Sequence, residues 1–129
     1  MSARLDMIGL VTCDMARSFR FYRTLGLNIP EEAPTDEPYF EITLESGVRV
    51  SWNHIDMVKS IHEWEEPRGQ RLSLAFLCDS PGSVDATYAH LADAGFEGVK
   101  APWDAFWGQR YALVRDPDGN VVDLFSPLG

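Results

Sequence analysis

This sequence has few cysteines and no long apolar segment. It has two cysteines in 129 residues, Cys13 and Cys78, which are too few for the disulfide framework of a small secreted domain. No apolar run reaches the roughly 18 residues that a membrane helix needs, and the opening MSARLDMIGLV has neither a basic leader nor a cleavage site. We therefore expect a cytoplasmic protein that does not bind a membrane and keeps reduced thiols at the ends of strands.

Positive charge is scarce as well. Eleven Lys and Arg residues stand against twenty Asp and Glu, which gives a net charge of −9, and no basic stripe occurs. A nucleic-acid backbone would be repelled by such a chain, so nucleic acid is excluded as a partner. An acidic surface can attract cationic ligands, but it also simply keeps a protein in solution.

Several motifs that carry chemistry are missing. There is no Gly-rich phosphate loop and no Gly-x-Ser-x-Gly elbow, so neither phosphate binding nor a nucleophilic triad is supported. The three histidines are His54, His62 and His90. Two belong to a polar connector and one to a helix, away from the strands on which a site would be built. The spacing of His62 with Glu65 and Glu66 is typical of a solvated acidic surface.

What the sequence does contain is two similar halves. With 45% hydrophobic residues, a chain of this size forms one domain with its own core. Residues 1–53 and 71–129 each predict a strand, an amphipathic helix ended by glycine and an antiparallel ribbon, with 54–70 as connector. The expected strands are 5–12, 39–44 and 48–52, then 72–78, 111–114 and 121–125, and the expected helices follow Asp14 up to Gly26 and span 83–94.

Neither half can cover its own apolar face, so we expect the two to pack together. A short helix with Ile55, Val58 and Ile61 on one side is the most that the connector can form. Because twisted ribbons curve, two copies facing each other enclose a concavity that can hold a ligand.

Two segments resemble one known family. The stretch RLDMIGLVTCDMARSFRFYRTLGL (residues 4–27) is similar to the opening of the vicinal oxygen chelate superfamily, and WGQRYALVRDPDGNVVDLF (107–125) is similar to its closing hairpin. That superfamily includes glyoxalase I, extradiol dioxygenases and bleomycin resistance proteins. The resemblance implies an α+β fold in which two βαβββ modules form a curled mixed sheet around a concave cleft. It also implies a homodimer.

The metalloenzymes of the superfamily hold a divalent ion with four residues, whose positions correspond here to Met7, to Val50 or a neighbour, to Ser73 and to Asp123. Only Asp123 is a competent ligand for such an ion, because thioether and hydroxyl groups are poor donors to zinc, iron, nickel or manganese. We therefore predict a protein without metal and without other cofactor. No catalytic residue can be named.

Aromatic residues offer a different kind of site. Strand alternation places Val121, Asp123 and Phe125 on one face. We expect this face to line the concavity together with the four aligned positions and the nearby aromatic segment, which suits a small aromatic or cationic molecule. The candidate ligand-binding residues are Met7, Val50, Trp52, Ser73, Trp103, Trp107, Arg110, Asp123 and Phe125.

Some of these assignments stay open. Trp103 and Trp107 could equally belong to a core or a subunit contact, and Arg110 could form a structural ion pair instead of binding an anion. Only one of Tyr39 and Phe40 can face the concavity. Trp64, in the connector, is a weaker candidate.

The resulting expectation is a binding protein similar to the bleomycin resistance proteins, which could protect its host from an antibiotic or metabolite. The alternative is an enzyme of the same superfamily: a lyase, isomerase or dioxygenase that uses a metal, or a metal-free catalyst with Asp123 as general base.

Overall fold

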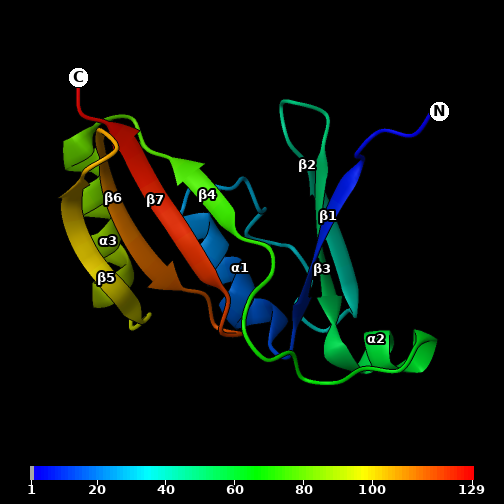
Figure 1. The fold of residues 1–129 in the computed structure, drawn as a ribbon. Helices are drawn as coiled ribbons and strands as arrows, with labels where there is room; N and C mark the ends of the chain where they lie inside the picture. Colours follow the sequence, from blue (N-terminus) through cyan, green and yellow to red (C-terminus); the bar gives the residue numbers. More distant parts are fainter. Residues whose placement is uncertain (1) are drawn as a thin grey trace.

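The structure is a computed structural model that describes residues 2–129. It contains seven strands and three helices within those residues (Figure 1). In chain order they are β1 (Met7–Thr12), α1 (Met15–Thr24), β2 (Tyr39–Thr43), β3 (Arg49–His54), α2 (Ile55–Ile61), β4 (Leu74–Leu77), α3 (Pro81–Asp93), β5 (Gly98–Ala105), β6 (Gln109–Arg115) and β7 (Val121–Pro127). None of these helices is long and apolar enough to cross a bilayer.

The first half forms a three-stranded sheet with the order β1-β3-β2. β1 runs parallel to β3, and β2 runs antiparallel to it. Helix α1 covers one face, where the rings of Phe19 and Trp52 meet edge to face at 5.6 Å and those of Phe19 and Phe40 at 5.4 Å. Phe40 therefore belongs to the core, and Tyr39 points to the open face, where its hydroxyl donates to Glu41.

The second half forms a four-stranded sheet with the order β4-β7-β6-β5. Helix α3 covers one face, and Val84 and Leu91 from the helix are buried with Val114, Val122 and Leu124 from the strands. Gly98 on β5 is closely covered by Tyr88 of α3. A Cβ at position 98 would lie 2.0 Å from the Tyr88 hydroxyl oxygen.

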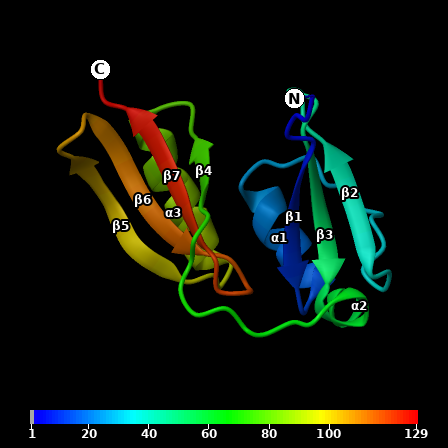
Figure 2. The same ribbon diagram turned by 45° about the vertical axis from the view of Figure 1, so that its right-hand side comes forward.

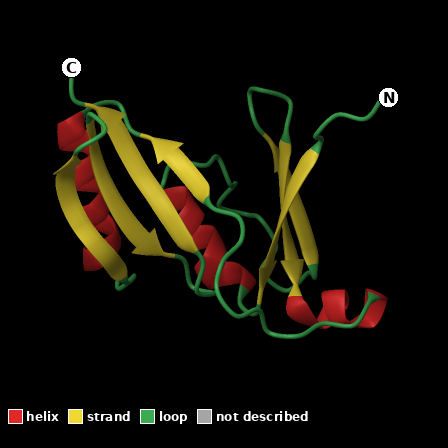
Figure 3. Cartoon of the chain, in the orientation of Figure 1, coloured by secondary structure: helices red, strands yellow, loops and turns green. Residues whose placement is uncertain are grey.

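The two sheets lie side by side with β1 and β4 at the facing edges, and α1 joins them from behind (Figure 2). Phe21 of α1 meets Phe96 of the second half at 5.1 Å, and Tyr22 meets Phe76 at 6.4 Å between ring centroids. Both halves thus share one core. Figure 3 shows α2 apart from the other helices, beyond the ends of β1 and β3.

The α+β fold class is confirmed, and most elements lie where the sequence predicts them. Asp14 caps α1 by accepting the Arg17 amide at 3.0 Å, and Gly26 follows the helix with φ of 108°. α3 begins earlier than expected, because Ser80 caps it and Pro81 occupies the first turn. Both cysteines are free and directly follow strands.

Two details differ from the expected architecture. The first half has three strands instead of four, since residues 28–38 remain irregular, whereas β5 completes the second half. The strands also form two separate sheets and not one curled sheet, because β1 and β4 do not pair.

Candidate functional site

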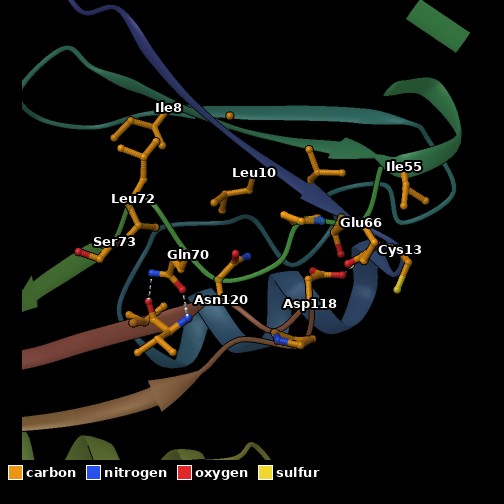
Figure 4. A pocket seen from close by; sticks show the side chains of 18 of the residues that line it. Ile8, Leu10, Cys13, Ile55, Glu66, Gln70, Leu72, Ser73, Asp118 and Asn120 are labelled. Atoms are coloured by element: carbon orange, nitrogen blue, oxygen red, sulfur yellow. Dashed lines mark hydrogen bonds between the residues drawn. The ribbon is translucent and has the colours of Figure 1, made fainter. Parts of the chain in front are cut away.

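A cavity of about 760 Å³ lies between the facing edges of β1 and β4. We call it the cleft. Ile8 and Leu10 of β1 point into it from one side, opposite Leu72 and Asn120 (Figure 4). The connector, the end of β1 and the turn before β7 complete its lining. This volume is in the range of ordinary small-molecule sites, which measure about 300 to 1,000 Å³.

Polar side chains also line the cleft. Gln70 binds the backbone of Val121 twice: its amide nitrogen donates to the carbonyl at 2.9 Å, and its oxygen accepts the amide N–H at 2.6 Å. This pair fixes the connector against the start of β7. Glu66 and Asp118 lie at the opposite end of the view in Figure 4. Among the described residues, no Lys, Arg or His lines the cleft, so its only charged groups are acidic.

One end of the cleft is closed by a joint between the two halves. The Tyr22 hydroxyl donates to Asp116 Oδ2 at 2.8 Å, and the Cys13 amide donates to Asp118 Oδ1 at 3.0 Å. Asp116 also accepts the backbone amides of Asp118 and Asn120 at 2.9 and 2.8 Å. Burial and the Asp116 carboxylate hold the pKa of Tyr22 far above its ordinary value, so this hydroxyl stays protonated as a donor.

The one cysteine among the described residues that line the cleft is not an activated nucleophile. Cys13 lines it at the end of β1, but burial and the charge of Asp118 raise the pKa of its thiol. A thiol with a raised pKa is a poor nucleophile at neutral pH.

Two of the predicted site residues, Met7 and Ser73, line the cleft. The placement predicted for Val50 and Trp52 is wrong: they are 6% and 0% exposed, because they point toward α1 and not toward the open face. Met7 pairs with Arg49 in the sheet, so Val50 lies one residue out of register and its side chain emerges on the other face. Trp64, which we expect to be a weaker candidate from the sequence, also lines the cleft.

Four other predicted residues, Trp103, Trp107, Asp123 and Phe125, belong to the second sheet or to the turn between β5 and β6. Two of them, Trp103 and Phe125, lie in one row on the open face of this sheet, together with residues that were not predicted. Trp103, Tyr111, Phe125 and Leu77 follow one another across the four strands in register. We call this row, with Trp107 beside it, the aromatic face. Tyr111 lies 5.6 Å from Trp103, 5.2 Å from Trp107 and 6.1 Å from Phe125, measured between ring centroids.

Asp123 lies in the neighbouring row of the same face, and we include this second row in the aromatic face. The register places Lys100, Leu113, Asp123 and Ala75 side by side across the strands. The Tyr111 hydroxyl donates to Asp123 Oδ2 at 2.5 Å. Burial, together with this hydrogen bond and the carboxylate charge, raises the pKa of Tyr111 to about 12.

Arg110 lies on the opposite face of β6. Its guanidinium group binds Asp85 of α3 and Asp104 of β5, both at 3.0 Å. It is therefore a structural ion-pair residue, the second of the two roles that the sequence left open. Arg110 does not line the cleft, and alternation along β6 places its side chain on the face opposite to Tyr111.

Comparisons with known proteins agree with this geometry. The sequence model of the Glyoxalase/Bleomycin resistance protein/Dioxygenase superfamily matches residues 4–124. The chain belongs to this superfamily. No protein of curated function matches it in sequence.

Solved structures of this superfamily share the fold. A glyoxalase/bleomycin resistance protein/dioxygenase family enzyme from Burkholderia phytofirmans PsJN has 21% sequence identity and a TM-score of 0.80, with 98% of this chain and 100% of that chain covered. A glyoxalase/bleomycin resistance protein/dioxygenase from Nocardioides has 25% identity and a TM-score of 0.72 over 99% and 85% of the two chains. A lactoylglutathione lyase from Agrobacterium tumefaciens has 16% identity and a TM-score of 0.66 over 97% and 94%.

The residues at the superfamily's metal positions do not suit a divalent ion. Met7 and Ser73 offer a thioether and a hydroxyl, Val50 is turned into the core, and Asp123 lies on the aromatic face. Within residues 2–129, no three His, Cys, Asp or Glu side chains lie close enough together to hold a metal. Transition ions require about three such ligands, whereas the four aligned positions offer only the carboxylate of Asp123.

Among the charged and aromatic residues of the aromatic face, Lys100 and Tyr111 are not predicted from the sequence. Tyr111 could have been found, because it alternates with Leu113 along a predicted strand. Lys100 could not: it lies three residues before Trp103, and regular alternation would place the two on opposite faces. A register shift in β5 between Lys100 and Trp103 brings both to the open face.

Proposed function

We propose that this protein is a metal-free binding protein of the glyoxalase/bleomycin resistance superfamily, and that it sequesters a small organic molecule in the cleft. The observation that carries the proposal is the cleft itself. It measures about 760 Å³ and has an apolar wall, an acidic rim and no lining residue of positive charge among those described. Such a site favours a molecule with an apolar body and a positive charge.

The two parts of the cleft would recognise the two parts of that molecule. Ile8, Leu10 and Leu72 provide apolar contact, and burial of apolar surface contributes about 25 cal/mol per Å². Glu66 would attract the charged group. Leu72 is 87% exposed at the lip of the cleft, and a bound ligand would cover it.

The alternative is a metal-dependent lyase, isomerase or dioxygenase. The likeness to a lactoylglutathione lyase at 16% identity supports the shared fold alone. The donor groups at the metal positions favour binding over such catalysis, and one titration in the presence and absence of chelator separates the two.

A homodimer is part of the proposal. Leu5 is 71% exposed beside the edge of β1, which pairs with no other described strand on that side, and contact with a second chain would cover it. Sedimentation equilibrium over a range of concentrations tests this point; a monomer throughout would contradict it.

The binding experiment uses naphthylmethylammonium as a cationic aromatic probe, with naphthalene methanol as its uncharged counterpart. Nuclear magnetic resonance of ¹⁵N-labelled protein resolves the indole N–H signals of the four tryptophans, assigned with Trp→Phe variants. We expect the cationic probe to shift the Trp64 signal in the presence of chelator. Glu66→Gln should weaken its binding several-fold, as expected for one lost charge contact at a partly exposed rim.

Glu65→Gln is the matched control, because Glu65 is the adjacent acidic residue and does not line the cleft. It should leave the affinity unchanged. Binding that requires an added divalent ion, or equal effects of the two variants, would refute the proposal. Turnover of the probe or of a thiol hemiacetal only with a metal would support the enzyme instead.

A further inference from the structure

A second, smaller pocket lies where α1 meets the segment after α3 and the turn before β7. Its volume is about 320 Å³. Arg17 of α1 lines it from the first half of the chain, and residues of the segments 95–97 and 115–119 line it from the second half. We call it the arginine pocket. Among the described residues only Pro117 also lines the cleft, so the two pockets are separate sites.

Two guanidinium groups at this place have no acidic partner. Arg17 and Arg20 are exposed and three residues apart on α1, so they share one face of the helix. Their guanidinium carbons lie 5.8 and 5.3 Å from the centroid of the Phe96 ring, and within residues 2–129 neither forms an ion pair. Helix α1 itself contains no Asp or Glu. Two like charges held beside one ring repel each other, and a bound anion would offset that repulsion.

The donors of the pocket are held on rigid parts of the structure. Phe96 is 6% exposed and meets Phe21 at 5.1 Å between ring centroids, so the ring beneath Arg17 is fixed in the shared core. Arg115 donates from Nε to Glu97 at 2.7 Å and from Nη1 to the backbone carbonyl of Gly119 at 3.0 Å. These two contacts orient its guanidinium plane, and Nη2 has no acceptor among the described residues. Groups that are already oriented lose little entropy when they bind a ligand.

The two carboxylates that line the pocket are already engaged. Glu97 pairs with Arg115. Asp116 is 4% exposed, and its oxygens accept four hydrogen bonds: two from backbone amides of its own turn, one from the Asn120 side chain and one from the Tyr22 hydroxyl. Donors directed at a carboxylate offset its negative charge locally. The uncompensated charge at this place is therefore positive.

We propose that the arginine pocket binds the phosphate group of a small soluble phosphate monoester. Arg17 and Arg115 line the pocket from different halves of the chain. A tetrahedral phosphate has oxygens for both groups, whereas a carboxylate commonly uses its two oxygens on one guanidinium. The volume lies near the lower end of the range of small-molecule sites, about 300 to 1,000 Å³.

The charge of the whole chain favours a small ion over a large polyanion. A net charge of −9 opposes docking on a nucleic acid or on an anionic membrane. Charges farther away than about 8 Å are largely screened at physiological ionic strength, so a small ion in the pocket responds mainly to the nearby arginines. This inference does not depend on the proposed function of the cleft, whose charged groups are acidic.

The test compares glycerol 3-phosphate, glycerate and glycerol by calorimetry at low salt. We expect glycerol 3-phosphate to bind most tightly, glycerate more weakly and glycerol not measurably. Arg17→Gln should weaken the binding of glycerol 3-phosphate about tenfold, as expected for one lost charge-assisted contact. Arg17→Lys should lie between the two, because it keeps the charge and loses the planar fork of donors.

Arg4→Gln is the matched control, because Arg4 is exposed, carries the same charge and lines neither pocket. It should change the affinity less than about twofold. Nuclear magnetic resonance of ¹⁵N-labelled protein should show shifts of the Nε–H signals of Arg17 and Arg115 on binding. The indole signal of Trp64 should not move. Thermal melting checks that the arginine variants are folded.

Several results would overturn this inference. Equal effects of Arg17→Gln and Arg4→Gln would show only a general response to charge, and tighter binding of glycerate would refute the phosphate class. A shift of Trp64 without shifts of the arginine signals would place the anion in the cleft. Binding to phosphatidate vesicles that Arg17→Gln abolishes, without binding of glycerol 3-phosphate, would show a membrane surface as the partner. The proposed function would survive the loss of this second site, because it is tested with a cationic probe at Trp64.

Discussion

Replacing Tyr22 by phenylalanine removes one hydrogen bond from the joint between the two halves and leaves the ring packing in place. The Tyr22 side chain is 0% exposed, and its hydroxyl donates to Asp116 Oδ2 at 2.8 Å. The ring also meets Trp52 and Phe76, which belong to different sheets. Because phenylalanine keeps both ring contacts, the substitution isolates the hydroxyl.

The expected loss of stability depends on the hydrogen bonds that Asp116 retains in the variant. A hydrogen bond to a charged group contributes about 1.5 to 3 kcal/mol. Asp116 retains the amides of Asp118 and Asn120 and the Asn120 side-chain amide as donors, so it is not left without partners. We therefore expect Tyr22→Phe to lower the free energy of unfolding by about 1.5 to 2 kcal/mol.

Urea denaturation followed by tryptophan fluorescence measures this change, and the m-value should stay constant because the exposed surface does not change. Tyr39→Phe is the matched control. The Tyr39 hydroxyl donates to Glu41 at 3.2 Å on the open face of the first sheet, and its loss should cost less than about 0.5 kcal/mol. If both variants lower the free energy of unfolding by the same amount, the hydrogen bond at the joint stabilises the protein no more than an exposed one, and the prediction is refuted.

Other predictions concern single positions. Gly98→Ala should destabilise the protein by about 1 to 3 kcal/mol in urea denaturation, because its Cβ meets a tyrosine of α3, while Gly82→Ala should not destabilise it. Trp52→Ala should cost about 3 to 5 kcal/mol in the same assay, as for a core residue. Alkaline titration followed by phenolate absorbance should show a step near pH 12 that belongs to Tyr111, because the Tyr111→Phe variant should lack it. Asp123→Asn should lower the pH of this step toward 10. Stability carried by protonated Tyr111 is present below about pH 10 and is lost as the pH rises toward 12.

The number of strands shows which parts of the fold can be predicted from local sequence patterns. The residues themselves predict two ribbon strands in each half, and the family resemblance implies three. In the first half the local pattern holds, because residues 28–38 contain Pro30, Pro34 and Pro38 and form no strand. Proline lacks the amide hydrogen that a strand needs for pairing. In the second half β5 forms as the resemblance implies, although its register shifts hide the alternation.

The site depends on register, which the sequence does not fix. Period-two alternation along β7 correctly places Asp123 and Phe125 on one face, since β7 is regular. In the first half, Val50 lies one residue away from the strand position that pairs with Met7. A difference of one residue turns a side chain from the open face to the core. The sequence tells which chemical groups stand at these positions. The direction in which each side chain points is known only from the pairing of the strands.

The residues that carry the family resemblance are also those that hold the two halves together. Tyr22, from the opening segment, binds Asp116 in the turn between β6 and β7, and Asp118 in that turn binds the backbone after β1. These contacts fix the relative position of the sheets and close one end of the cleft. Of the groups in this joint, Cys13 and Asp118 also line the cleft. A sequence can therefore identify this fold through its joint, while the chemistry of a molecule that the cleft could accept would also depend on residues outside the motifs, such as Glu66.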